Sequence, residues 1–225
     1  MIALAALLLA AQPAGAAAER ALLDFRYDWP AEAEAIPALR TELQRRRRAA
    51  PDEALANARE TSDSSRDAHV PFHTEMHHQS WSVEARNGRY LALTADIRTD
   101  QNGAHPNRGF EALIWDRRRN RPTSVRALLG PAVLARLTPA FCSHLAAAVQ
   151  ARGGEPPSHC PPLAEQVLSF LDQDGNGRFE TVHVLIPPYV AASYADGSFV
   201  VDVLLNRGDL AGVADREGLE ETPGR

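Results

Sequence analysis

Histidine is the residue type with which this sequence could most directly perform chemistry. His73, His77 and His78 lie within one short segment, and His105 lies alone in a loop rich in turn-forming residues. Two histidines four residues apart on a helix can bind one zinc ion, so the first group suggests a metal-dependent envelope hydrolase or a deacetylase-associated protein. Alternatively, a hydrolase of the envelope would use His105 as a general base. A metal-dependent envelope enzyme is therefore the alternative to a protein that binds without catalysis.

The surroundings of the first histidine group favour a different interpretation. The His-Thr-x-x-His pattern is similar to the zinc motif of polysaccharide deacetylases, but residues 19–72 contain no Thr-Phe-Asp-Asp-Gly segment to supply the aspartates. The histidines also lead directly into residues 79–85, which alternate as a strand does. Residues four apart on a strand lie about 13 Å from each other, too far to bind one ion. We therefore expect exposed histidines on a strand.

An acidic segment, residues 172–180, offers a second candidate for metal binding. Asp172, Asp174 and Asn176 occupy the first, third and fifth positions of a calcium-loop pattern. His183 stands at the twelfth position, where that loop needs a bidentate glutamate, and both flanks read as strands. Tight hairpins also use Asp, Asn and Gly for reasons of backbone geometry. We favour the hairpin, with calcium as the alternative and no other cofactor expected.

Strands and turns must position these residues. Residues 79–97 alternate around Asn87-Gly88, a strong hairpin turn, and residues 110–115 alternate in the same way after the loop 101–109. Further strands are predicted at 22–29, 165–171, 181–186 and 199–205. A helix is predicted from residue 31 to a break at Pro51, with a mobile loop at 60–71 and a second helix from Gly130-Pro131. This pattern predicts an α+β fold, an antiparallel sheet with two or more helices packed against it.

Composition and the chain start suggest an exported protein. Residues 1–18 are apolar and then rich in small residues, as in a secretory signal peptide, and are too short for the roughly 20 apolar residues of a membrane span. We expect a periplasmic or secreted protein with no transmembrane segment in its mature part, a single domain over 19–205 and a polar, frayed tail over 206–225. The net charge of −5 argues against nucleic-acid binding.

The two cysteines, Cys142 and Cys160, are 18 residues apart. In an exported chain an even pair predicts a disulfide. The alternative is a metal site that would include the neighbouring His144 and His159.

Three motifs together carry a family resemblance. They are Gly-Ala-His-Pro-Asn at 103–107, the helix that follows Leu-Leu-Gly at 128–130, and Pro-Pro-Tyr-Val-Ala-x-x-Tyr-Ala-x-Gly-x-Phe at 187–199. They resemble a domain-of-unknown-function family found in the extracellular part of the lysozyme-sensing anti-sigma factor RsiV and in the non-catalytic half of the peptidoglycan deacetylase PdaC. The resemblance spans Leu22 to Leu205. It implies an α+β domain and, in the RsiV member, binding of lysozyme.

These observations predict a non-catalytic, exported cell-envelope module that binds a lysozyme-type muramidase or peptidoglycan fragments. The residues expected to line its binding site are Asn102, His105, Asn107, Arg108, Tyr189 and Tyr194. The sequence has no Gly-x-Ser-x-Gly nucleophile motif, and a disulfide would occupy both cysteines. A loop at 102–108 that bonds only to its own backbone is the alternative to direct ligand contact.

Overall fold

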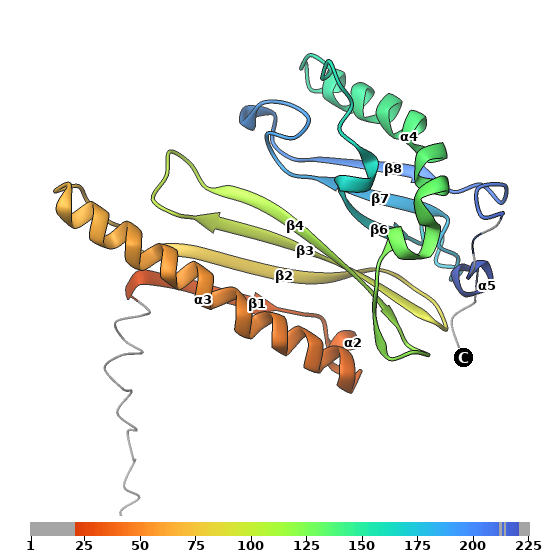
Figure 1. Cartoon of the computed structure of the whole chain (residues 1–225), viewed down its shortest axis with the longest axis horizontal. Coiled ribbons are helices and arrows are strands. Elements are labelled where there is room, and N and C mark those ends of the chain that lie inside the picture. Colours follow the sequence, from red (N-terminus) through yellow and green to blue (C-terminus); the bar gives the residue numbers. More distant parts are fainter. Residues whose placement is uncertain (1–20, 212, 214, 221–225) are drawn as a thin grey trace, which may run out of the picture.

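The protein is described by a computed structural model over residues 21–211, 213 and 215–220, and the predicted signal peptide lies outside these residues. Two sheets and two long helices make up the fold (Figure 1). The strands are β1 (Leu23–Asp28), β2 (Glu75–Arg86), β3 (Tyr90–Asp100), β4 (Asn107–Asp116), β5 (Arg121–Thr123), β6 (Val167–Leu171), β7 (Thr181–Ile186) and β8 (Phe199–Leu204). The helices are α2 (Ala31–Glu34), α3 (Pro37–Asp67), α4 (Val125–Ala151), α5 (Arg216–Leu219) and the 3₁₀ turns η1 (Leu163–Glu165) and η2 (Tyr194–Asp196).

The larger sheet has the order β1-β2-β3-β4-β5. Its central pairs are antiparallel, as predicted, whereas β1 pairs in parallel with β2 because α3 carries the chain back between them. Alternate residues of β1 to β4 face α3 and form an apolar cluster with Leu39 and Leu43 of that helix. The opposite face is apolar at only one end, where Tyr90, Ala92 and Ile114 join the second core. The rest of that face is mostly polar, with Thr94, Asp96 and Arg98 on β3.

The smaller sheet, β6-β7-β8, is antiparallel throughout. Helix α4 covers one face of it with a buried stripe that includes Val133, Leu137, Phe141 and Leu145. Gly130 has a φ of 76°, in the left-handed region, and separates the first turn of α4 from the main helix at Pro131. Among the described helices α4 alone has the length and apolar composition of a membrane span, and its packing on β6–β8 is that of a core helix.

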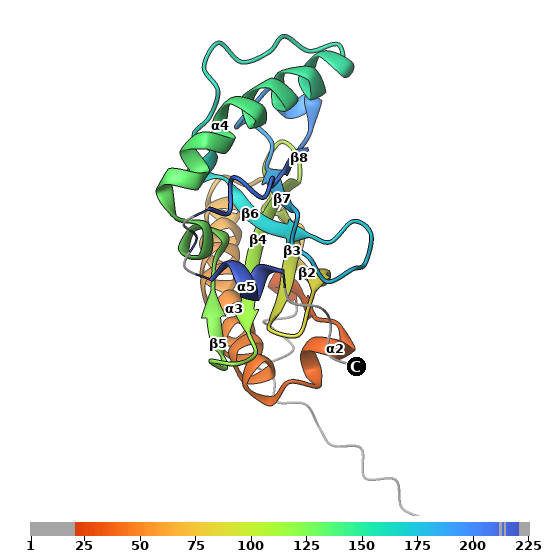
Figure 2. The ribbon, with the colours of Figure 1, turned by 90° about the vertical axis from the view of Figure 1, so that its right-hand side faces the viewer.

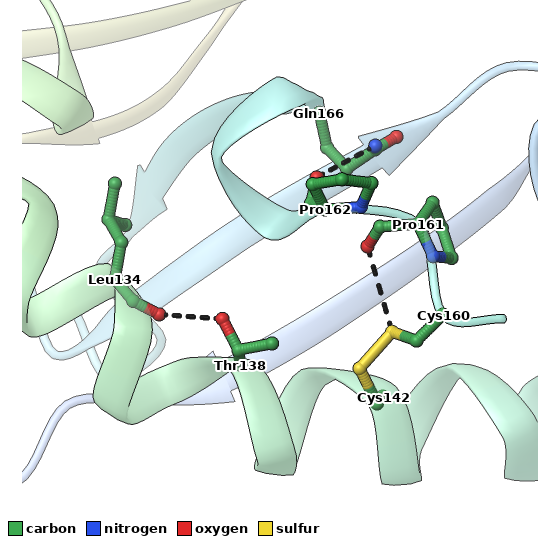
Figure 3. The surroundings of a disulfide bond; sticks show 7 residues. All are labelled: Leu134, Thr138, Cys142, Cys160, Pro161, Pro162 and Gln166. Atoms are coloured by element: carbon green, nitrogen blue, oxygen red, sulfur yellow. Dashed lines mark hydrogen bonds between the residues drawn. A yellow bond between two sulfur atoms is a disulfide. The ribbon is translucent and has the colours of Figure 1, made fainter.

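The predicted disulfide is present. Cys142 of α4 is bonded to Cys160 in the loop before η1, with the two Cα atoms 5.6 Å apart (Figure 3). The loop that begins at the end of α4 is thereby attached to the middle of the same helix. The α+β fold class and the disulfide are both confirmed.

The predicted helix break at Pro51 is wrong, and of the predicted loop at 60–71 only residues 68–71 lie outside the helix. Helix α3 continues through Pro51 to Asp67. A proline inside a helix removes one backbone hydrogen bond, but helix formers surround Pro51, and Ala54 and Ala58 of the following turns are buried. Tertiary packing thus outweighs the local cost of the proline.

The part of the predicted frayed tail that the structure describes is packed rather than loose. Leu210 and Leu219 are buried, and the amide of Asn87 in the β2–β3 turn donates to the carbonyl of Gly218, 3.0 Å away. Figure 2 shows α5 beside the large sheet. Arg89 and Tyr90 bind Asp215 through an ion pair and a hydrogen bond of 2.6 Å. The polar composition suggested a frayed tail, because no local pattern indicates partners that lie more than 100 residues away in the chain.

Candidate binding site

Two loops from different sheets meet at one end of the molecule. One connects β3 to β4 and carries His105; the other connects β7 to β8 and carries Tyr189 and Tyr194. The imidazole of His105 stacks on the ring of Tyr194, with centroids 3.5 Å apart and an angle of 16° between the rings. Its Nε2 lies 2.8 Å from the hydroxyl of Tyr189. The three side chains therefore form one cluster that joins the sheets.

Backbone contacts hold this cluster in place. The hydroxyl of Tyr194 donates to the carbonyl of Pro106, and Nδ1 of His105 lies 3.1 Å from the same carbonyl. Tyr189 has a φ of 70°, in the left-handed region that a tyrosine seldom adopts. Its side chain is also 63% exposed. A strained backbone that presents an aromatic ring to solvent is typical of a binding loop.

Arg108 lies next to the cluster and links the same two loops. Its guanidinium pairs with Asp96 on β3 and donates to the hydroxyl of Ser198 before β8, 3.3 Å away. It also lies over the ring of Phe110, 5.1 Å from the centroid. Because the pair with Asp96 is exposed, its main effect is to orient the guanidinium rather than to stabilise the fold.

The remaining two predicted site residues lie apart from the cluster. Asn102 has a φ of 59° and exchanges two hydrogen bonds of 2.9 Å with the backbone of His73. It therefore fastens the hairpin tip to the segment before β2. Asn107 begins β4, pairs with Thr99 and is exposed. The structure thus gathers four of the six residues, namely His105, Arg108, Tyr189 and Tyr194.

A polar groove that the sequence did not predict begins at Asp96. It has a volume of about 460 Å³ and lies on the face of the large sheet that α3 leaves open. Side chains from three neighbouring strands line it, among them Arg26, His78, Ser80, Ser82, Asp96 and Arg98. Since Asp96 also binds Arg108, the groove continues the site formed by the loop cluster. The alternation of Ser80 and Ser82 with Trp81 was the signal for a polar face.

The zinc alternative for His73, His77 and His78 has no support in the structure, because the three side chains do not converge. His73 precedes β2 and lies 3.2 Å from a carboxylate oxygen of Asp100. His78 lies 2.8 Å from Asp24 on the open face, whereas His77 stacks on Phe25 on the α3 side. Burial lowers the pKa of His77. The strand geometry expected from the sequence therefore separates them.

A row of serine, histidine and aspartate crosses the small sheet. Ser169, His183 and Asp202 are direct neighbours on β6, β7 and β8, and Nδ1 of His183 lies 2.7 Å from the carboxylate of Asp202. This is the order of a nucleophilic triad. Ser169 is fully buried, however, and its hydroxyl bonds to none of the described residues. A substrate carbonyl could not reach it without separating the sheets.

The acidic loop brings together a set different from the one predicted. Asp172, Asp174 and Glu180 present carboxylate oxygens within 4.8 Å of one another. Asn176 instead donates its backbone N–H to both aspartates, at 3.0 and 3.1 Å, as in a self-contained hairpin. Glu180 occupies the ninth position of the calcium-loop pattern when Asp172 is counted as the first. That position supplies a ligand in such loops, so the sequence pattern could have indicated Glu180.

We predict that the loop at 172–180 keeps its shape without a metal. Burial, followed by the charges of Asp174 and Asp172, raises the pKa of Glu180. An acid whose pKa is raised on folding loses stability as the pH rises through its unfolded value towards the folded one. Glu180→Gln should therefore raise the melting temperature at pH 7 and leave it unchanged at pH 3. A calcium-induced rise in melting temperature that Glu180→Gln abolishes would instead identify a calcium site.

Comparisons with known proteins give structural neighbours only. No family model matches the chain, and no curated protein matches it. A DUF3298 family protein from Pseudomonas aeruginosa is 17% identical, with a TM-score of 0.45, over 70% of this chain and 68% of that one. A DUF3298 member from Bacteroides fragilis is 12% identical, with a TM-score of 0.48, over 77% and 68%. These neighbours come from a domain-of-unknown-function family, the general class that the sequence resembles.

Proposed function

We propose that this protein is a non-catalytic binding module of the cell envelope, that it acts after export, and that it binds peptidoglycan fragments. The observation that carries the proposal is the pair of loops that meet through His105, Tyr189 and Tyr194 and leave Tyr189 exposed on a strained backbone. An aromatic ring of this kind is a platform on which the apolar face of a sugar ring can stack.

The groove beside the cluster supports a ligand with many hydroxyl and amide groups. Its lining alternates serine hydroxyls with acidic and basic side chains, so donors and acceptors of both kinds are present. Neither sign of charge dominates, which suits a mostly neutral glycan better than a polyanion. The volume of the groove, about 460 Å³, lies within the range of small-molecule sites.

A lysozyme-type muramidase is the second candidate ligand. The family resemblance of the three motifs is its support, since the best-understood relative binds lysozyme. A protein partner would contact the exposed Tyr189 and Val190, which are 63% and 40% exposed. Both candidate ligands would contact the loop cluster, but only a peptidoglycan fragment would also occupy the groove.

The proposal is tested by measuring the Kd of soluble muropeptides for the wild type and two variants. Tyr189→Ala removes an exposed aromatic anchor and should weaken binding at least tenfold, the usual effect of losing such a residue. Val190→Ala changes the neighbouring exposed side chain and should leave the Kd unchanged. Val190→Ala should keep the wild-type melting temperature, and Tyr189→Ala should lower it only slightly, because the exposed Tyr189 loses one hydrogen bond, to His105.

Two results would revise the proposal. Equal muropeptide binding by Tyr189→Ala and the wild type would remove the loop cluster from the site. Binding of a lysozyme-type muramidase without any muropeptide binding would keep the module but replace its ligand, and the same two variants would then be compared against the muramidase.

A further inference from the structure

An apolar hollow lies between helix α4 and the segment that leads into η1, close to the disulfide (Figure 3). Its volume is about 390 Å³, within the size range of small-molecule sites. Most of its lining is apolar, from Pro131, Leu134 and Ala135 on the helix and from Pro162 and Leu163 on the facing segment. The hollow shares no residue with the loop cluster or with the polar groove, so it is a separate feature of the surface.

Two attachments hold the walls of the hollow, and neither fills the space between them. The disulfide joins α4 to the facing segment at Cys160. Arg126, in the first turn of α4, is hydrogen-bonded to the backbone of η1 and of the residue that follows it. Leu134 and Leu163 form the floor, because they are only 4% and 1% exposed and belong to the core of the small sheet. The exposed lining residues, such as Ala135, are too short to reach across.

The walls of the hollow offer few hydrogen-bonding groups. Proline has no backbone N–H, and both Pro131 and Pro162 line the hollow. The hydroxyl of Thr138 donates to the carbonyl of Leu134, 2.9 Å away, so it is already paired within the helix (Figure 3). Water in the hollow therefore finds few partners, and an apolar group that displaces it gains affinity.

A single cation interrupts this apolar lining. Arg126 is the one charged residue among the described residues that line the hollow. Its guanidinium donates to the carbonyls of Ala164 and Gln166, which fix its position, and no described acid forms an ion pair with it. A guanidinium has five N–H donors, so two hydrogen bonds leave three for another acceptor. The positive charge at the edge of the hollow therefore complements an anionic group, and a carboxylate fits such donors well.

We propose that this hollow binds a fatty acid of medium chain length. The alkyl chain would lie over Leu134 and Leu163, and the carboxylate would accept hydrogen bonds from Arg126. An alcohol of the same length would fill the hollow but leave the charge of Arg126 without a counter-ion, and Arg126 would repel an alkylammonium ion. A glycan would leave its hydroxyl groups unpaired against these walls, which separates this ligand from the one proposed for the groove.

Calorimetry on the full chain tests the proposal with octanoate, decanoate and dodecanoate, each below the concentration at which it forms micelles. Burial of one CH₂ group improves the Kd by up to roughly fourfold, so decanoate should bind about tenfold more tightly than octanoate. Decanol should bind more weakly than decanoate, and decylammonium should not bind. Vesicles of anionic phospholipid should not retain the protein. Retention by vesicles without binding of any free acid would overturn the proposal in favour of a membrane surface.

Two matched variants place the ligand. Ala135→Phe puts a large side chain into the hollow and should abolish decanoate binding. Ala147→Phe makes the same change at an exposed alanine of α4 outside the lining and should bind as the wild type does. Both variants should keep nearly the wild-type melting temperature, because both alanines are exposed. The proposal fails if Ala135→Phe binds decanoate normally or if the Kd does not depend on chain length.

A third variant tests the role of the charge. Arg126→Met keeps an apolar stem but removes the guanidinium, so it should weaken decanoate binding at least tenfold and leave decanol binding unchanged. Equal weakening of both ligands would show that Arg126 only holds the walls of the hollow, and the carboxylate would then have no partner there.

Discussion

Replacing Arg89 with methionine is expected to lower the free energy of unfolding by about 3–5 kcal/mol, the usual result of removing one partner from a buried ion pair. Arg89 is 9% exposed and binds Asp116, which is 1% exposed, at 3.3 Å. It also binds Asp215 of the C-terminal segment at 2.5 Å. Without the guanidinium, a buried carboxylate would lose its main cationic partner and the C-terminal segment would lose an anchor.

Arg119→Met is the matched control. Arg119 reaches the same carboxylate of Asp116 at 3.4 Å, but its side chain is 55% exposed. An exposed ion pair contributes about 0–1 kcal/mol, so this variant should stay close to the wild type. Urea unfolding measures both variants, and equal losses in the two would show that burial of the Arg89 pair does not determine its strength.

The pH dependence of stability gives a second measurement on the same residues. Burial acts to raise the pKa of Asp116, but hydrogen bonds from the backbone of Arg119 and the side chain of Arg89 outweigh it, and the net pKa is lowered. A lowered acid pKa contributes stability above the unfolded value near 4, and this stability is lost as the pH falls below it. The fall in stability between pH 5 and pH 2 should be shallower in Arg89→Met.

The strands could be predicted from the sequence because each has a local cause. Alternation over 79–97 and the Asn87-Gly88 turn determine the β2–β3 hairpin and its two faces. The same strand pattern predicts that His73 and His77 lie about 13 Å apart, which argues against zinc. The disulfide was predicted from an even pair of cysteines in a chain expected to be exported.

The features that could not be predicted depend on partners far away in the chain. The C-terminal segment has a polar composition, yet Asp215 meets Arg89 across 126 residues. The parallel pairing of β1 with β2 places Tyr27 beside Gln79, which no local pattern specifies. The loop cluster could be predicted in part. The family motifs indicated its residues, but the stacking of those residues depends on the β7–β8 loop reaching the β3–β4 hairpin.

The second large effect is expected on removing the disulfide. It closes a loop of 18 residues between α4 and the segment that leads to η1 and β6. Restricting the unfolded chain in this way stabilises a fold by roughly 3 kcal/mol at this loop length. The double variant Cys142→Ala/Cys160→Ala should therefore unfold at a lower urea concentration than the oxidised wild type.

A reductant provides the internal control for this prediction. The wild type under reducing conditions should unfold as the double variant does, and the double variant should not respond to the reductant. The cysteines are partly buried against the small-sheet core, and Cys160 lies beside Pro161 (Figure 3), so each alanine also removes some packing. Reduction leaves both sulfur atoms in place. A stability loss seen in the double variant but not on reduction would therefore assign the effect to packing, whereas equal losses assign it to the covalent link.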